Sequence, residues 1–314
     1  MAKSDFNFDL YRLTIHDDES LLDFMGTPIR TDDQIISVVK KACDSSHDHR
    51  QEARRATYLW GLRNFMELPS GGVSDGVQCF AVTLAKATVE QQGVIITSNA
   101  IKPGKSEAQP PLADVITLIF QMKRHLVAVE YKSTVSYGGG WLSAFHEILQ
   151  AVSTGLNYRS KIELQPKPKN AEILKTFASF QRLTRIKVEL LLPNPELSRL
   201  TEKLFAQLQE GGVREYLADM KNPNGLSQKE LTLPHAAAAM AEDGYKKGDV
   251  ILEGIRDGKK ETIKTGMRPA RGRVDGVKDF VRGLATSAKT KEGKIITEAI
   301  LKEIDRIAPE QRAE

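Results

Sequence analysis

The chain has 314 residues, of which 40% are hydrophobic and 27% are charged, and its formal net charge is +4. That length can bury a sizeable core, and the mild positive charge allows nucleic-acid binding without requiring it. The sequence holds no signal-type apolar segment and no membrane-spanning apolar run, so we expect a cytoplasmic protein.

The two cysteines, Cys43 and Cys79, have no CxxC spacing and are predicted to be free thiols in a reducing compartment. No metal site and no cofactor site is predicted, because no cluster of His and Cys has ligand spacing.

The first third of the chain is predicted to hold one strand and two helices. Residues 6–15 alternate as a strand does, and Thr31 is a candidate N-cap for a helix that reaches Ala42. Residues 51–66 carry apolar side chains at helical spacing and are predicted to form a second helix. Its arginines are interpreted as a solvated face in preference to a phosphate contact; they are Arg50, Arg54, Arg55 and Arg63.

The middle of the chain is predicted to be rich in strands. Residues 70–72 are predicted as a turn, 76–87 and 93–97 as two strands, and 102–111 as a loop. Residues 111–134 consist of two aliphatic runs around a polar tetrapeptide, which predicts a β-hairpin. Residues 142–156 then form an amphipathic helical pattern.

Residues 164–170, with two prolines and two lysines, are the best candidate for a linker between two domains, 1–163 and 171–314. The second domain is predicted to begin with a strand at 185–192, followed by helices at 194–209 and 226–243. Its strongest turn signal is Asp257-Gly258, which predicts a hairpin. Helices at 274–284 and 293–307 complete an α+β fold of two domains, with a mixed, mainly antiparallel sheet and packed helices.

Asp114, Glu130 and Lys132 all belong to the hairpin at 111–134. Two carboxylates and a lysine on one sheet face are typical of nucleases that cleave phosphodiesters with Mg²⁺. Strand alternation decides whether such a site can form. A hairpin loop with an odd number of residues places Asp114 on the face of Glu130 and Lys132, whereas an even number places it behind them. Alternatively, the same residues are explained by an ordinary half-exposed strand that forms no catalytic site.

A cluster of basic residues falls in or just after the hairpin around Asp257-Gly258. Several cations on one surface can neutralise the phosphates of a DNA duplex, and a two-stranded ribbon can present them. The alternative is a solvated charged surface. The candidate DNA-binding residues are Arg256, Lys259, Lys260, Lys264, Arg268, Arg271 and Arg273.

Residues 110–305 resemble the Rex phage-exclusion family, that is, RexA and its bacterial relatives. The resemblance is carried by the tetrapeptide Val129-Glu130-Tyr131-Lys132, by the strand and helix at 185–209, and by the late hairpin at 249–265. It implies a homodimer that binds double-stranded DNA with little sequence preference. It also implies a role in abortive infection beside a membrane partner protein, with no small-molecule substrate and no enzymatic activity.

These observations leave three functional hypotheses. The preferred one is sequence-nonspecific binding of duplex DNA through the basic hairpin. The second is a Mg²⁺-dependent nuclease that uses Asp114, Glu130 and Lys132. The third is a protein-interaction or sensor module that contacts no nucleic acid. Whether the chain is an enzyme stays open at this point, with a non-enzymatic role favoured.

Overall fold

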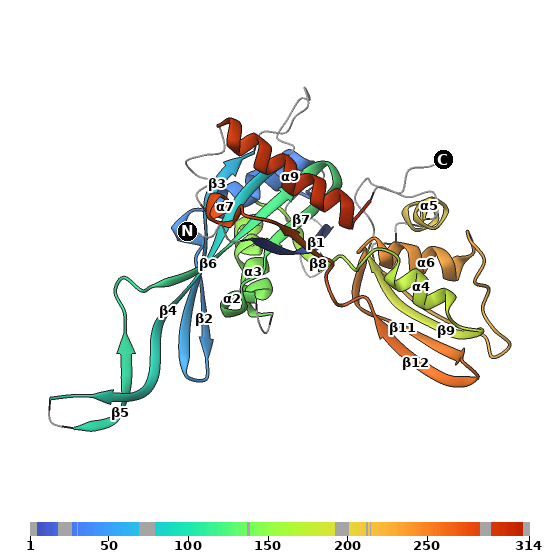
Figure 1. Cartoon of the computed structure of the whole chain (residues 1–314), viewed down its shortest axis with the longest axis horizontal. Helices are drawn as coiled ribbons and strands as arrows, with labels where there is room; N and C mark the ends of the chain where they lie inside the picture. Colours follow the sequence, from blue (N-terminus) through green and yellow to red (C-terminus); the bar gives the residue numbers. More distant parts are fainter. Residues whose placement is uncertain are drawn as a thin grey trace.

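The computed structural model describes residues 5–17, 27–29, 31–68, 79–98, 100–136, 139–191, 201–211, 213, 215–282 and 290–309. In this part of the chain, mainly antiparallel strands form two sheets, and helices pack on both of them (Figure 1). The predicted α+β class is confirmed.

The large sheet has the strand order β13-β1-β7-β6-β4-β3-β2, with β5 added beside β4 and β8 beside β1. All of these pairs are antiparallel. The strands are β1 (Phe6–Asp17), β2 (His49–Ala53), β3 (Ala56–Glu67), β4 (Cys79–Ile96), β5 (Ile101–Glu107), β6 (Ala113–Gln121), β7 (Leu126–Glu130), β8 (Ser160–Pro166) and β13 (Arg271–Val274).

Helices cover both faces of the large sheet. Helices α1 (Asp32–Lys41) and α3 (Gly140–Gly155) pack on one face, and α9 (Lys291–Ile307) packs on the other. Strand β7 is therefore buried throughout: Val127 and Val129 face α1 and α3, whereas Leu126 and Ala128 face α9. The short elements are η1 (Ser45–His47), η2 (Met122–Arg124), α2 (Ser133–Ser136) and α7 (Lys278–Arg282).

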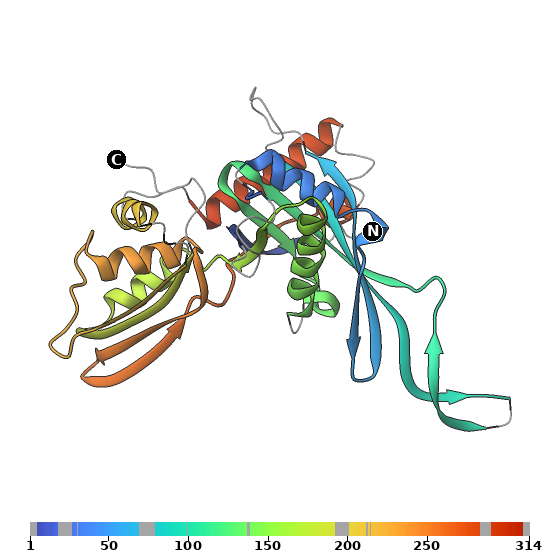
Figure 2. The same ribbon diagram turned by 180° about the vertical axis from the view of Figure 1, so that it is seen from behind.

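The small sheet has the order β10-β9-β11-β12, and its helices cover only one face (Figures 1 and 2). Ile186, Val188 and Leu252 point from the strands toward Phe177 and the alanine-rich centre of α6. The elements are α4 (Glu172–Ala178), β9 (Arg182–Leu191), α5 (Glu202–Glu210), β10 (Glu215–Lys221), α6 (Leu233–Glu242), β11 (Lys246–Arg256) and β12 (Lys259–Thr265). The face away from the helices is called the open face below.

The small sheet is inserted between β8 and β13 of the large sheet. Strand β13 pairs with β1, and Val281, Ile296 and Ile300 pack in the core beneath it, so the chain returns to the large sheet after residue 270. This arrangement differs from the expected second domain at 171–314. The expected linker at 164–170 starts as the end of β8, where Leu164 pairs with Leu13.

A buried polar junction joins the two sheets. The Nε of Arg12 on β1 donates to the Asp243 carbonyl at 2.8 Å, and its guanidinium lies 4.7 Å from the centre of the Tyr245 ring. The Nζ of Lys167 donates to the Glu242 carbonyl at 2.6 Å, and burial lowers the pKa of this lysine. Buried polar groups with partners fix geometry, so the junction defines how the small sheet is attached.

Several sequence predictions are confirmed. The first strand and both hairpins form, and α3 matches the helix predicted at 142–156. Helix α1 begins with a reciprocal capping box, in which Thr31 Oγ1 accepts from the Gln34 N–H at 3.3 Å and Gln34 Oε1 accepts from the Thr31 N–H at 3.1 Å. Cys43 and Cys79 are both free, and burial raises their pKa values to about 11 and about 12.

The helix predicted at 51–66 is wrong, because these residues form the hairpin β2–β3 around Arg54-Arg55. Pairing of β3 with β4 and a bond from Trp60 Nε1 to Gln51 Oε1 at 2.9 Å outweigh the helical spacing of the apolar residues. Gly61 was the missed signal, since glycine is unfavourable inside a helix. In the hairpin, a Cβ at Gly61 would lie 2.4 Å from the Asp48 carboxylate, so the close approach requires glycine.

The loop predicted at 102–111 is also wrong in its first part, where β5 pairs with β4. Two strands were predicted at 76–87 and 93–97, but the structure has one long strand there, β4, which also includes the residues between them. The helix predicted at 226–243 is shorter, since α6 begins at Leu233. The turn predicted at 70–72 and the start of the helix predicted at 194–209 lie outside the described residues.

Candidate nucleic-acid interface

The open face of the small sheet carries charged side chains in rows across the strands. In one row, Asp219, Lys187, Ile251 and Lys264 are aligned from β10 to β12. The next row is Lys221, Arg185, Glu253 and Thr262. Neighbouring side chains in such rows are about 5 Å apart, so these charges act as one surface.

The acids on this face are matched by cations. Arg185 donates to both oxygens of Asp219, at 2.8 and 3.0 Å, and its Nη1 donates to Glu253 at 2.7 Å. The hydrogen bond from Arg185 holds the pKa of Asp219 down at about 2. Lys221 adds a contact of 3.3 Å to the same carboxylate. The negative charges of Asp219 and Glu253 are therefore neutralised within the protein.

Other cations on the open face are available to a ligand. Arg182 and Ile255 are partners across β9 and β11, and Ile255 is opposite Lys260 on β12. Within the described part of the chain, no ion pair involves Arg182, Lys187, Lys260 or Lys264. Because Asp219 and Glu253 are neutralised within the protein, these four unpaired cations give the face a net positive charge.

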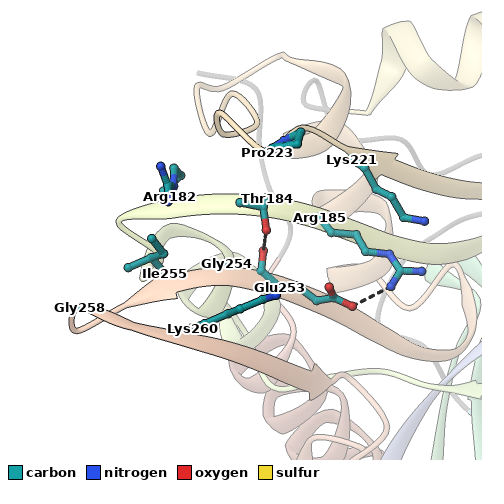
Figure 3. Close-up of a pocket in the computed structure, with 10 residues that line it drawn as sticks. All are labelled: Arg182, Thr184, Arg185, Lys221, Pro223, Glu253, Gly254, Ile255, Gly258 and Lys260. Carbon is teal, nitrogen blue, oxygen red and sulfur yellow. Dashed lines mark hydrogen bonds and ion pairs between the residues drawn. The ribbon is translucent and has the colours of Figure 1, made fainter.

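A groove of about 480 Å³ crosses this face beside the β11–β12 turn (Figure 3). Arg185 reaches Glu253 on one side of it, and Thr184 Oγ1 donates to the Glu253 carbonyl at 3.1 Å. The lining residues are Arg182, Thr184, Arg185, Lys221, Pro223, Glu253, Gly254, Ile255, Gly258 and Lys260. The groove is thus lined mainly by cations, and its apolar side chains are Pro223 and Ile255.

The β11–β12 turn places two lysines at the end of the sheet. Asp257 and Gly258 both have positive φ, 49° and 73°, as the tight two-residue turn of a hairpin requires. The Gly258 N–H donates to Gln181 Oε1 at 3.1 Å, which links the turn to the residue directly before β9. Lys259 and Lys260 follow directly and are exposed.

The structure brings together only part of the predicted basic cluster. Lys260 and Lys264 lie on the open face, whereas Arg256 and Lys259 alternate to the other side near the turn. Arg268 is exposed in the connection after β12.

Arg271 and Arg273 lie on β13 of the large sheet, away from the hairpin. Arg271 pairs with Asp9 at 2.8 Å, and Arg273 pairs with Asp5 at 2.6 Å. Their positive charges are therefore paired with carboxylates of the same protein.

The sequence reasoning missed the cations that β9 and β10 contribute. Arg185 and Lys187 alternate with Ile186 and Val188, and this period of two could have assigned them to one exposed face. The Arg54-Arg55 turn was also missed, because its hairpin was taken for a helix. Both arginines are exposed, and the turn lies on the same side of the molecule as the open face (Figures 1 and 2).

The hairpin β6–β7 does not gather Asp114, Glu130 and Lys132 on one face. Its four-residue loop, 122–125, is even, so Asp114 is on the α3 side and Glu130 on the α9 side. Glu130 is buried and accepts from the Thr117 N–H at 3.1 Å. Lys132 lies beyond the end of β7 and reaches Asp114 at 2.6 Å, which lowers the pKa of that carboxyl. Within the described residues, no group of three His, Cys, Asp or Glu side chains could hold a metal ion.

Residues 97–280 match a family described as a domain of unknown function, DUF4747. The match spans more than half of the chain. The chain belongs to this family. The matched region begins directly after β4, ends within α7 and includes the whole small sheet. None of the curated proteins matches the chain. Among the described residues, no helix is long and apolar enough to cross a membrane.

Proposed function

We propose that this protein binds double-stranded DNA with little sequence preference, through the open face of the small sheet and the β11–β12 turn. The observation that carries the proposal is the set of cations on this face that have no internal ion pair, Arg182, Lys187, Lys260 and Lys264. Lysine and arginine side chains bind phosphates and release the counterions of the duplex, which favours binding whatever the sequence.

The distribution of charge supports the same surface. Residues 167–269 contain 18 Lys and Arg against 14 Asp and Glu, so this segment alone accounts for the net charge of +4. No aromatic side chain occupies the open-face positions of the described strands, where Leu191, Leu217, Ile251 and Ile255 are the apolar residues. Single-strand binding proteins stack bases on aromatic rings, so this composition favours duplex backbone over unpaired bases.

The test replaces three unpaired lysines, in the variant Lys187→Ala/Lys260→Ala/Lys264→Ala. Binding to unrelated duplexes of equal length is measured by fluorescence anisotropy over a salt series. We expect weaker binding to every duplex alike. The slope of log affinity against log salt should become shallower by about 3, roughly one for each lost phosphate contact.

The matched control is Lys291→Ala/Lys294→Ala/Lys302→Ala, which removes the same charge from exposed positions of α9. It should bind nearly as the wild type does. An equal loss of affinity in both variants would show that binding depends only on the net charge of the protein. An unchanged salt slope in the first variant would contradict the proposed surface.

The resemblance to the Rex family suggests the setting in which DNA binding would act. We extend the proposal to phage exclusion by abortive infection on that ground, together with a homodimer and a membrane partner protein. The same triple-lysine variant tests it: cells that carry the wild-type protein should restrict phage plating, and cells that carry the variant should lose that restriction. Restriction that survives the loss of DNA binding would separate the two roles.

A further inference from the structure

The strands β4 and β5 extend from the large sheet as a two-stranded ribbon, here called the arm (residues 92–96 and 101–105). Pairing between β3 and β4 ends at Ala56 and Gln91, and beyond it β4 is paired with β5 alone. Figures 1 and 2 show the arm projecting away from both sheets. A two-stranded ribbon is marginally stable in water by itself, so an arm of this kind gains from a surface to pack on.

One face of the arm is apolar and exposed. Val94 is opposite Pro103, and Ile96 is opposite Ile101, so these four side chains share a face. The exposed fractions are 69% for Val94, 82% for Ile96 and 72% for Ile101. An exposed cluster of large aliphatic side chains on one face of a projecting element marks an interaction surface.

The opposite face of the arm is different. There Ile95 is half-buried and lies over Gly104, where an added Cβ would come within 2.4 Å of the isoleucine side chain. An added Cβ at Gly104 would therefore displace the Ile95 side chain from this position. The arm therefore packs its own aliphatic side chain on one face and leaves the other face, with Val94, Ile96 and Ile101, without a partner in the described chain.

The small sheet carries an apolar groove of about 710 Å³ between α5 and the start of α6. Leu231 and Leu233 line it and are 59% and 43% exposed. Leu204, Ala206 and Ala236 line the rest, and Glu202, Lys203 and Gln207 complete the lining. This volume is in the range of pockets that bury several apolar groups. The groove lies on the helical side of the small sheet, away from the open face.

The arm cannot reach the groove of its own chain, because the two lie at opposite ends of the long axis of the molecule (Figures 1 and 2). We propose that the apolar face of the arm docks in the α5–α6 groove of a second copy of this chain. Exchange of both arms around a twofold axis closes the assembly as a dimer and covers both apolar surfaces.

The charges of the two surfaces are compatible with this contact. On the side of the apolar face, Lys105 of the arm pairs at 2.7 Å with Glu90, which lies on β4 just before the arm begins. The groove carries one acid and one base, Glu202 and Lys203. Neither surface has a net charge that would repel the other, so burial of the aliphatic side chains is unopposed.

The test compares the mass of the full chain in solution by analytical ultracentrifugation. We expect a dimer for the wild type and a monomer for Ile96→Asp/Ile101→Asp, which places two carboxylates on the apolar face. The control Gln91→Asp/Ser106→Asp adds the same charge to the opposite face of the ribbon and should stay dimeric. The groove variant Leu231→Asp/Leu233→Asp should also be monomeric. Circular dichroism checks that each variant is folded.

A cross-linking experiment tests the geometry directly. One preparation carries Ile96→Cys and a second, differently tagged one carries Leu233→Cys. After mixing and mild oxidation, the disulfide should join the two different chains in preference to two identical chains.

A monomeric wild type overturns the proposal, and so does a dimer that survives the Ile96→Asp/Ile101→Asp substitution. Binding of a monomeric wild type to phosphatidylcholine vesicles would identify a bilayer as the partner instead. DNA binding by the open face is independent of this contact, so the DNA-binding proposal and the arm contact can fail separately. A monomeric wild type would also overturn the homodimer in the proposed function.

Discussion

The hairpins β6–β7 and β11–β12 have the same topology but opposite surroundings. The first lies between β1 and β4 in the large sheet, and helices cover both of its faces. The second ends the small sheet at β12, and one of its faces is open. The buried charged residues of the covered hairpin are bound internally: Glu130 accepts from the Thr117 N–H, and Arg124 pairs with Asp305. Lys260 and Lys264 on the second hairpin stay available, so sheet coverage decides which charges can bind a ligand.

The largest difference between the two hairpins should appear in stability. Phe120 on β6 is fully buried and stacks on Phe80, with the ring centres 4.4 Å apart. Phe120→Ala should lower the free energy of unfolding by about 3–5 kcal/mol, because it removes apolar contacts and leaves a cavity. Ile255→Ala, on the open face, should cost under about 1.5 kcal/mol. Urea unfolding followed by circular dichroism compares them, and equal losses would contradict the difference in coverage.

The start of β11 offers a second comparison, between Lys246 and Lys247. Lys246 is completely buried, donates to the Gly248 carbonyl at 2.7 Å, and has its pKa lowered by burial to about 8. The folded protein therefore binds this proton less tightly than the unfolded chain, whose lysine has a pKa near 10.4. Stability should rise between pH 8 and about 10.5, by up to roughly 3 kcal/mol.

Lys246→Met should be more stable than the wild type below pH 8, and this difference should vanish above about pH 10.5, where both states are neutral. The matched control is Lys247→Met, because the Lys247 side chain is half exposed and lies 3.6 Å from Glu189. Urea unfolding at a series of pH values measures both. A pH dependence that is the same in the wild type and Lys246→Met would contradict the role of this lysine.

Glu130 and Lys132 should differ despite their shared motif. Glu130→Ala removes the acceptor of the Thr117 N–H and should cost about 1–3 kcal/mol. Lys132→Ala breaks a pair with Asp114, whose side chain is 45% exposed, and should cost less than about 1 kcal/mol. Thermal unfolding of the two variants measures both costs. A greater loss for Lys132→Ala would show that the ion pair, and not the buried carboxylate, holds this end of the hairpin.

Local signals in the sequence predicted much of the fold. The capping box at Thr31, the Asp257-Gly258 turn and the aliphatic runs of β6 and β7 each depend on a few adjacent residues. The β2–β3 hairpin was missed because its apolar residues also fit a helix, and pairing with β4 decides between the two. The return of β13 to β1 joins residues more than 260 positions apart, as Asp9 and Arg271 are, and no local pattern encodes it.

The candidate interface was predicted only at its β12 edge. Lys260 and Lys264 were found because they are close in sequence to a strong turn signal. Arg182 and Lys187 come from another strand, and only the register of β9 against β11 places them on the same face. Arg271 was included for its position in the sequence, although its partner Asp9 is at the other end of the chain.

The turns of two hairpins differ in how directly they should contact DNA. Arg54 and Arg55 are exposed at the β2–β3 turn, on the side of the molecule to which the open face is turned (Figure 1). A duplex long enough to extend past the small sheet could meet them, whereas a short one could not. Arg54→Ala/Arg55→Ala should therefore weaken binding of a long duplex by a few-fold and leave a short duplex nearly unaffected, since each lost phosphate contact removes about one unit of salt slope. Anisotropy titrations with duplexes of increasing length measure this dependence. A loss that is equal at all lengths would place the arginines in the primary site, and no loss at any length would restrict the interface to the small sheet.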